Sequence, residues 1–316
     1  MTNGTNLAIV IPAYKIDFFE DVLRSLSLQT CRNFNVYVGI DASPYDFESV
    51  IERFSDKLNL KTQRFKENLG GRDLVGQWNR CLAMTGGEEW VWLFSDDDIM
   101  EPNCVEFFYK QIEKKESIDI YHFNVDIIDN KGTVINNSKA FPEVISGIDY
   151  LRLKNASKLN SFVVEFIFKR SVFEKLGGFQ KFDMAWGSDV ATWAKIGREK
   201  GIKTIPGVKV LWRSSGINIT TTISKEIIIR KLSANVDYYR WCKENFSEIT
   251  YCDIFYYMSS MLMYYSPYIS SKDFYPVVLP LYSDYFGGRV MLNIIRLFYP
   301  VVRLVHKLKH AFENNY

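Results

Sequence analysis

The first 130 residues alternate short β-rich runs with stretches in which apolar residues recur at helical spacing. Strands joined by helices over short connections form βαβ units and a mainly parallel sheet with helices on both faces. The patterns predict strands at 7–11, 34–40, 60–65, 90–94 and 118–128. They predict helices at 18–28, 47–58, 73–84 and 103–115. The sequence therefore predicts an α/β fold.

Polar residues follow several of the predicted strands, at the point where each strand ends. Tyr14 and Lys15 follow the first strand, Asp41 follows the second, and the run 96–98 follows the fourth. In open α/β sheets ligands bind beyond the carboxyl ends of the strands, so we expect these side chains to share one crevice. The chain has neither a Gly-x-Gly-x-x-Gly pattern after the first strand nor a Walker-type Gly-Lys-Ser/Thr, which argues against dinucleotide dehydrogenases and P-loop enzymes.

Asp96, Asp97 and Asp98 form a run of adjacent carboxylates. Such carboxylates repel one another unless a cation compensates their charge. Their hard oxygen atoms favour Mg²⁺ or Mn²⁺, and an ion held there would stabilise the charge on a departing diphosphate. The run is equally compatible with a solvated loop that caps a helix, because Asp is favoured just before a helix.

A second acidic position, Asp189, precedes a predicted helix over 190–200. Taken alone, this position predicts a helix N-cap. If Asp189 faces the crevice formed by the first half of the chain, it can instead act as a general base that takes a proton from an attacking sugar hydroxyl. The residues themselves leave both roles open.

The character of the sequence changes near residue 226, where helical patterns rich in Tyr, Met and Ile begin to predominate. We therefore predict a first domain at 1–225 and a helical C-terminal region at 226–316, which would serve acceptor binding or membrane-surface association. The stretch 254–271 carries no charge, but its Ser and Tyr residues and Pro267 favour a buried helical hairpin over a membrane span.

The segment 288–312 has a basic residue at every seventh position. Arg289, Arg296, Arg303 and His310 recur between Ile, Leu, Phe and Val side chains. This pattern is typical of a basic amphipathic segment that lies on an anionic membrane surface. It is equally typical of a terminal helix that docks on the body of the protein and leaves a solvated basic stripe.

Charge and cysteine usage restrict the partners and the compartment. The 39 basic and 37 acidic residues nearly balance, so no charge excess indicates nucleic acid. The five cysteines show no Cys-x-x-Cys spacing and the N-terminus lacks the pattern of a signal peptide. We therefore expect a cytoplasmic protein, peripheral at the inner face of the membrane if 288–312 binds lipid. His122, His306 and His310 do not form a zinc-binding set.

Several short motifs follow one another in order between residues 7 and 222. They are Ile9-Val10-Ile11-Pro12-Ala13-Tyr14-Lys15, Ser25-Leu26-Ser27-Leu28-Gln29-Thr30, Asp41-Ala42-Ser43, Asn68-Leu69-Gly70-Gly71, Trp78-Asn79, Trp92-Leu93-Phe94-Ser95-Asp96-Asp97-Asp98 with Pro102, Gly177-Gly178-Phe179 and Trp186-Gly187-Ser188-Asp189. In this order and spacing they resemble the family 2 glycosyltransferases of the GT-A fold. The resemblance implies a Rossmann-like, mainly parallel sheet flanked by helices, and inverting transfer of a sugar from a nucleotide diphosphate.

The resemblance also implies roles for the residues that match the family motifs. The nucleotide-binding residues would be Pro12, Ala13, Tyr14, Asp41, Asn68 and Asp96. Asp41 would contact the base, which is uracil in well-understood members. Mn²⁺ or Mg²⁺ would bind to Asp97 and Asp98, and Asp189 would be the catalytic base. Trp186 and Arg213 would contact the diphosphate or the acceptor, although Arg213 can equally pair with a surface acid.

The sequence departs from the family pattern at three positions. Ile40 precedes Asp41 where the family often has a second acid, which bears on base selection. Ser95 takes the place of the first acid of the Asp-x-Asp motif, so the three following Asp residues share the metal role. Ser188 replaces the acid that commonly precedes the catalytic base and leaves the base itself in place.

The leading prediction is an inverting, metal-dependent glycosyltransferase of surface polysaccharide or lipopolysaccharide synthesis. Its donor would be a UDP-sugar and its acceptor a glycan or a lipid-linked glycan. An alternative is a non-catalytic subunit of glycan assembly that retains the fold as a binding module. A nucleotidyltransferase is a third reading, but such enzymes usually carry a Gly-rich basic loop after the first strand, and residues 12–15 do not form one.

Overall fold

The computed structural model describes residues 6–216 and 223–313, and the side chains of these residues as far as 305. The described residues form two compact units. The first comprises 6–181 and 188–216, and the second comprises 182–187 and 223–313. The short segment 182–187 therefore belongs with the C-terminal helices, whereas the predicted division at residue 225 assigns it to the first domain.

The first unit contains all the strands of the described chain. These strands are β1 (Leu7–Ala13), β2 (Asn35–Ile40), β3 (Leu60–Arg64), β4 (Trp90–Leu93), β5 (Ile99–Met100), β6 (Ile120–Ile128), β7 (Val134–Asn137), β8 (Val144–Ile145), β9 (Phe166–Lys169) and β10 (Ile202–Arg213). Its helices are α1 (Phe19–Ser27), α2 (Phe47–Glu52), α3 (Leu74–Leu82), α4 (Cys104–Ile112), α5 (Gly147–Asn155), α6 (Arg170–Lys175) and α7 (Ser188–Ile196), with a 3-10 turn η1 (Val163–Glu165).

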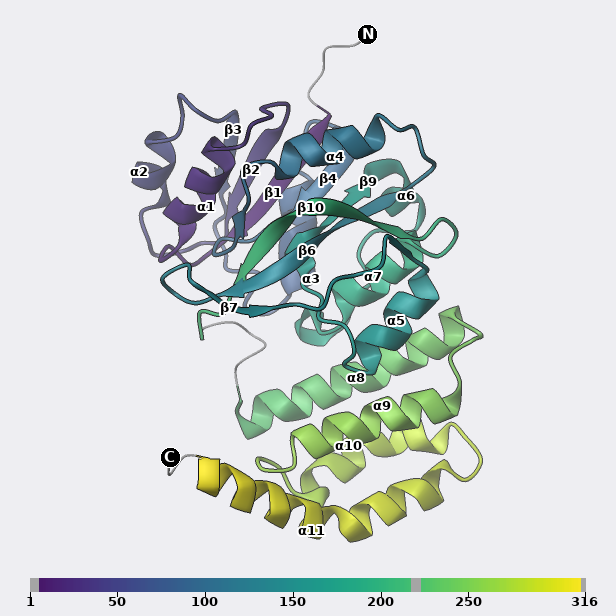
Figure 1. The fold of residues 1–316 in the computed structure, drawn as a ribbon. Coiled ribbons are helices and arrows are strands. Elements are labelled where there is room, and N and C mark those ends of the chain that lie inside the picture. Colours follow the sequence, from purple (N-terminus) through teal and green to yellow (C-terminus); the bar gives the residue numbers. More distant parts are fainter. Residues whose placement is uncertain (1–5, 217–222, 314–316) are drawn as a thin grey trace. The chain divides into compact units, whose positions relative to one another are not determined.

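The strands form one mixed sheet in the order β3-β2-β1-β4-β9-β6-β10-β5 (Figure 1). The first four of these strands are parallel to one another, and β6 is parallel to β10. Strand β9 is antiparallel to both of its neighbours, β4 and β6. Two short strands add to the sheet, β7 against β6 and β8 against β10, both antiparallel. The α/β fold with helices around a central sheet is confirmed, and the parallel pairing predicted by the strand–helix alternation is found in its N-terminal part.

Helices cover both faces of this sheet. Leu7, Ile9 and Ile11 point into the main core with residues of α1, α2 and α4. On the opposite face, β2 and α3 approach so closely that a Cβ at Gly39 would lie 2.3 Å from Cys81 Sγ, so only glycine leaves room for the helix. Burial on both faces explains why the first strand is a continuous apolar run rather than an alternating one.

The predicted helix over 47–58 is shorter in the structure. Asp46 caps α2 by accepting a hydrogen bond from the Ser49 N–H at 3.0 Å, and α2 ends at Glu52. The chain then continues in turns as far as Leu58. Ser55 and Asp56 lie in that part, and their side chains favour turns over helix interiors.

The second unit is helical. It contains the 3-10 turn η2 (Asp183–Ala185), α8 (Lys225–Asn245), α9 (Tyr251–Tyr264), α10 (Ser271–Ser283) and α11 (Gly288–Glu313). This agrees with the predicted helical C-terminal region. Pro267 lies in the turn between α9 and α10, and both helices begin with a capping box. Across the described residues, no helix is both long enough and apolar enough to cross a bilayer.

Candidate active site

The acidic run lies just beyond the end of β4, and its three carboxylates are buried. The backbone N–H groups of Tyr14 and Lys15 both donate to Asp96 Oδ2, each at 2.7 Å. These two hydrogen bonds tie the acidic run to the carboxyl end of β1. The structure therefore brings together two of the polar groups that the strand pattern predicted to meet.

Asp98 is held from two sides. Its Oδ2 accepts a hydrogen bond from the Ser95 hydroxyl at 2.5 Å, and its Oδ1 accepts one from the Arg213 backbone N–H at 2.7 Å. The second bond connects the acidic run to the end of β10. Both oxygens of Asp98 are thus engaged within the protein. This geometry favours an anchor for the loop after β4 over the metal ligand that the family resemblance implies for Asp98.

Lys15 forms an ion pair with the middle carboxylate of the run. Its Nζ lies 2.8 Å from Asp97 Oδ2. In the described part of the chain, neither Oδ1 of Asp96 nor Oδ1 of Asp97 makes a hydrogen bond or an ion pair. Two carboxylate oxygens near the ends of β1 and β4 therefore remain free to bind a ligand.

The electrostatics of the run favour a bound cation. Burial and the charge of Asp97 raise the pKa of Asp96 to about 6, and the same two causes raise the pKa of Asp98 above its ordinary value. Burial opposes the charge of Lys15, but the charges of Asp97 and Asp96 outweigh it and raise the pKa of this amine. Positive charge is thus favoured at this place, and Lys15 supplies one such charge.

The acidic run offers a divalent ion only part of a coordination shell. Among the described residues, no three His, Cys, Asp or Glu side chains are grouped so that they could hold a metal ion. Mg²⁺ is commonly bound through one or two carboxylates together with phosphate oxygens of a substrate. The free Oδ1 atoms of Asp96 and Asp97 fit that arrangement, in which a bound diphosphate supplies further ligands.

Arg213, at the end of β10, is almost fully buried, with 1% of its surface exposed. Its Nε donates to the Asp97 carbonyl at 2.8 Å, and its Nη1 donates to the carbonyls of Asp129 at 3.0 Å and Asn130 at 3.2 Å. Its Nη2 forms an ion pair with Asp21 Oδ2 at 3.1 Å. Of the two predicted roles, this geometry favours pairing with an acid, and it makes Arg213 a support beneath the acidic run.

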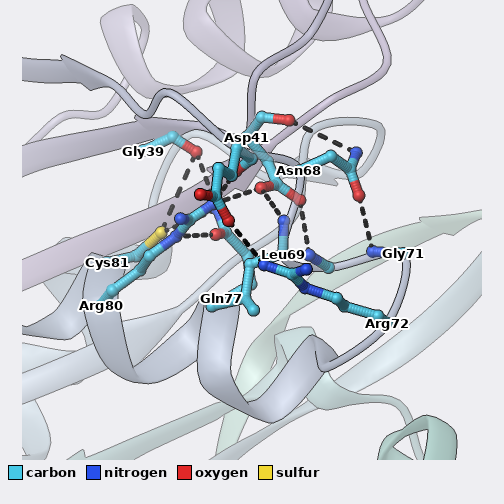
Figure 2. A network of polar contacts seen from close by, with 11 residues as sticks. Gly39, Asp41, Asn68, Leu69, Gly71, Arg72, Gln77, Arg80 and Cys81 are labelled. Carbon is cyan, nitrogen blue, oxygen red and sulfur yellow. Dashed lines mark hydrogen bonds and ion pairs between the residues drawn. The ribbon is translucent and has the colours of Figure 1, made fainter.

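Asp41 lies at the end of β2 and is 3% exposed. Its carboxylate accepts hydrogen bonds from the backbone N–H of Leu69 and of Gly70, each at 2.7 Å, and it forms an ion pair with Arg80 (Figure 2). Its backbone N–H donates to the Ala13 carbonyl at 2.8 Å. Asp41 therefore fixes the loop before α3 against the end of β1.

Helix α3 orients this network. Arg80 donates to Asp41 and to the Gln77 side chain, and its guanidinium lies over the Phe65 ring with 3.9 Å to the centroid. Gln77 in turn donates to the Gly39 carbonyl at 3.2 Å (Figure 2). Sequence reasoning did not single out Arg80. Its position directly after the Trp78-Asn79 motif was the available signal.

The loop that Asp41 holds begins with Asn68. The Asn68 side chain accepts a hydrogen bond from the Gly71 N–H at 2.9 Å and donates to the Asp41 carbonyl at 3.4 Å. A Cβ at Gly70 would lie 2.7 Å from Asp41 Oδ2, so a side chain at that position would collide with the carboxylate. Asn68 thus lies beside Asp41, in the group of residues predicted to bind the nucleotide.

Pro12 and Ala13 end β1, and Tyr14 follows directly, between these two networks. Ala13 is buried, whereas the Tyr14 side chain is 43% exposed. The Tyr14 carbonyl accepts a hydrogen bond from the Ser43 hydroxyl at 2.7 Å. The exposed Tyr14 ring therefore stands at the junction of the Asp41 network and the acidic run, where a planar base could stack on it.

Asp189 is the second residue of α7 and lies in its first turn, so it is a helical residue rather than the N-cap. A carboxylate in a first turn interacts favourably with the helix dipole. Burial raises the pKa of Asp189, and the charge of Lys154 opposes this shift. Asp189 also adds to the raised pKa values of Tyr150 and Glu165, which burial mainly causes. Among the described residues, none of the hydrogen bonds or ion pairs of the acidic run involves Asp189.

The residues around Asp189 form a buried polar cluster that sequence reasoning missed. Tyr150 Oη lies 2.8 Å from Ser161 Oγ, and Lys154 Nζ donates to the Ser161 carbonyl at 3.0 Å. Glu165 Oε1 lies 3.4 Å from His122 Nε2. These residues come from α5, β6 and the segment before β9, and no short motif in the sequence links them.

Trp186 belongs to the second unit, where α8 holds the segment that contains it. Lys231 Nζ lies 4.6 Å from the centroid of the Trp186 ring, and Arg230 forms an ion pair with Asp183 at 2.8 Å. Met184 and Ala185, which lie between Asp183 and Trp186 in the chain, have positive φ angles of 58° and 56°. Strained backbone of this kind costs about 1–3 kcal/mol per residue and is common near functional sites.

The mixed α/β sheet with an acidic run at the end of β4 matches a glycosyltransferase domain. The family model described as Glycosyl transferase family 2 matches residues 8–177, which is more than half of the chain. The chain belongs to glycosyl transferase family 2. No curated protein matches the sequence.

Solved structures share the fold at low sequence identity. The complex of S. aureus TarS 1-349 with UDP-GlcNAc has a TM-score of 0.60 at 14% identity, covering 98% of this chain and 92% of that one. The crystal structure of S. aureus TarS has a TM-score of 0.59 at 13% identity, covering 96% of this chain and 54% of that one. GalNAc-T7 with UDP, GalNAc and Mn²⁺ has a TM-score of 0.52 at 12% identity, covering 74% and 48%. At these identities the likeness concerns the fold.

Proposed function

We propose that the chain transfers a sugar from a UDP-sugar to a glycan or lipid-linked acceptor in the synthesis of a cell-surface polysaccharide, with inversion at the anomeric carbon. The observation that carries this proposal is the connected set of hydrogen bonds between Asp41, the end of β1 and the acidic run. A nucleoside diphosphate fits this set, because its base and its diphosphate need two neighbouring polar sites. The similar TarS and GalNAc-T7 structures, which are complexes with UDP-GlcNAc and with UDP, support the choice of nucleotide.

In the proposed mechanism, the nucleotide binds along the ends of β1 and β2. Tyr14 stacks on the base, while Asp41 and Asn68 hold the surrounding loop. Asp189 takes the proton of an acceptor hydroxyl, whose oxygen forms a bond to the anomeric carbon as the bond to the diphosphate breaks. The electron pair of the broken bond between the anomeric carbon and the diphosphate oxygen stays with that oxygen, and UDP departs. A divalent cation held by Asp96 and Asp97 would supply compensation for the charge on the departing diphosphate.

A thermal-shift screen of nucleoside diphosphates, with and without Mn²⁺, tests this proposal. A ligand that binds the native state at 100 times its Kd adds about 2.7 kcal/mol of stability. We expect UDP to raise the Tm more than ADP or GDP, and more with Mn²⁺ than without it. If no nucleoside diphosphate raises the Tm in either condition, the proposed donor class is wrong and a non-catalytic binding subunit becomes the better account.

The ion pair between Lys15 and Asp97 gives a prediction about the cation itself. The Lys15 ammonium competes with a divalent ion for Asp97, so Lys15→Met should increase the affinity for Mn²⁺ in the absence of nucleotide. Removing a charge 2.8 Å from the carboxylate should lower the Kd about tenfold, which corresponds to ~1.4 kcal/mol. Free Mn²⁺ is measured by its electron paramagnetic resonance signal.

Lys169→Met is the matched control, because Lys169 also pairs with a carboxylate, Glu89 at 3.2 Å, elsewhere on the first unit. It should leave Mn²⁺ binding unchanged. An unchanged Mn²⁺ affinity in Lys15→Met would show that Asp97 is not a metal ligand.

A further inference from the structure

Helix α11 packs on the second unit through one narrow face. Leu292 and Tyr299 are 0% and 1% exposed. The Tyr299 hydroxyl donates to the Leu262 carbonyl of α9 at 3.1 Å, and its ring lies 4.6 Å from that of Phe274 in α10. This face anchors the helix, and it accounts for only a small part of the apolar side chains that α11 carries.

Another face of α11 is apolar and exposed to solvent. Eight large apolar side chains between residues 290 and 305 have exposed fractions of 42% to 72%. At 100° per residue they fall in one stripe that covers roughly 140° of the helix and extends for roughly 22 Å. The stripe consists of Val290, Met291, Ile294, Leu297, Phe298, Val301, Leu304 and Val305. Phe286, just before the helix, is 98% exposed. Soluble monomers rarely expose a contiguous apolar surface of this kind.

Three arginines line one edge of the stripe. Arg289, Arg296 and Arg303 follow at seven-residue intervals, so they fall on the same side of the helix. Arg289 Nε donates to the Ser283 hydroxyl at 3.0 Å, and Arg296 lies 4.7 Å from the Tyr275 ring centroid. None of the three forms an ion pair with an acidic side chain in the described residues. Their positive charge is therefore not neutralised by an ion pair with an acidic side chain in this part of the chain.

A hollow joins the basic edge to the apolar stripe. It has a volume of about 250 Å³ and is lined by Ser270, Ser271, Tyr299, Pro300, Arg303 and Leu304. The buried Nε of Arg303 has no hydrogen-bond partner among the described residues. A phosphate group at this place could accept a hydrogen bond from that nitrogen, and acyl chains could follow Leu304 along the stripe.

These observations together favour one kind of partner. A second copy of the chain would match one apolar stripe to another, but it would also bring two rows of arginines together without acids between them, since 285–312 contains no Asp or Glu. An anionic lipid surface offers both an apolar interior and negative headgroups. We propose that the stripe and the arginine row of α11 bind the protein to the surface of an anionic membrane. The helix would lie in the membrane–water interface rather than cross the bilayer, because arginines and Pro300 interrupt its run of apolar residues.

Vesicle flotation of the full chain tests this proposal without any substrate, so it is independent of the proposed transferase activity. The probes are vesicles of phosphatidylcholine alone and of phosphatidylcholine with 30% phosphatidylglycerol. We expect at least tenfold tighter binding to the anionic vesicles. The double variant Leu297→Glu with Val301→Glu should lower this binding at least tenfold, and Arg289→Gln with Arg296→Gln should remove most of the preference for anionic lipid.

The matched control is Val134→Glu with Ile135→Glu on β7, which adds the same charge at exposed apolar positions of the first unit. It should bind vesicles like the wild type, and circular dichroism checks that every variant remains folded. Absent vesicle binding, or equal binding by the Leu297 and Val301 variant, would overturn the proposal. So would a concentration-dependent dimer, measured by light scattering, that this variant converts to monomers, because the stripe would then bind a second copy.

Discussion

Asp189→Asn is expected to abolish sugar transfer while leaving UDP binding nearly unchanged. The amide keeps the shape of the carboxylate but cannot take a proton from the acceptor hydroxyl. A positioned general base contributes about 10²–10⁴-fold to a rate, so kcat should fall by that factor. Release of UDP from a UDP-sugar in the presence of a glycan acceptor extract measures turnover, and the UDP-induced thermal shift measures binding.

Asp149→Asn is the control, because Asp149 is exposed on the neighbouring helix α5 and caps it with Ser146. It should retain full turnover. Full turnover in Asp189→Asn would show that Asp189 is not the catalytic base. Loss of the UDP-induced shift would instead indicate that Asp189 acts in binding.

The pH dependence of turnover provides an independent readout of the same residue. Burial raises the pKa of Asp189, and Lys154, Tyr150 and Glu165 are the ionisable groups coupled to it. A base is active when deprotonated, so kcat should fall as the pH is lowered through this raised pKa. The acidic limb of the profile should therefore lie above the pH range of an ordinary aspartate.

Arg213→Met is expected to cause the largest loss of stability in the first unit. Its guanidinium donates to three backbone carbonyls and pairs with Asp21. Arg213 itself is only 1% exposed. Asp21 is half-exposed, so the main cost comes from the three carbonyls that lose their donor. A buried acceptor left unsatisfied costs about 1–3 kcal/mol, so we expect a loss of at least about 3 kcal/mol. Urea unfolding followed by tryptophan fluorescence should show a loss of this size in the free energy of unfolding.

Arg72→Met is the control, since Arg72 is 66% exposed and pairs only at the surface with Glu67. Such pairs contribute about 0–1 kcal/mol. If Arg213→Met is as stable as Arg72→Met but no longer binds UDP, then Arg213 serves the diphosphate rather than the fold.

The parts of the site that depend on strand order were predictable from the sequence. Tyr14, Asp41 and the run 96–98 each follow an apolar run, and parallel strands bring such positions to one edge of a sheet. The antiparallel course of β9 was not predictable, because a short buried strand has the same apolar pattern in either direction. Its place beside β4 involves Trp92, which pairs with Ile167 of β9 and donates from its Nε1 to the Val164 carbonyl just before β9 at 2.6 Å.

Contacts between residues far apart in the chain could not be predicted from the sequence either. The Arg213 guanidinium meets Asp21, which is 192 positions away, and no local pattern marks such a pair. Likewise, the pattern identified Asp41 as a functional candidate but could not show that its carboxylate holds Leu69 and Gly70. Lys154 lies near Asp189 through the packing of α5 on α7, which needs glycine at position 147 because a Cβ there would lie 2.3 Å from the Ala194 carbonyl. Glu165 joins them from η1, before β9.

A crystal structure of the protein with UDP and Mn²⁺ tests the central claim most directly. We expect the uracil to lie against Tyr14 and Asp41, and the diphosphate to share the cation with Asp96 and Asp97. Density for UDP away from the carboxyl ends of β1, β2 and β4 would contradict the account.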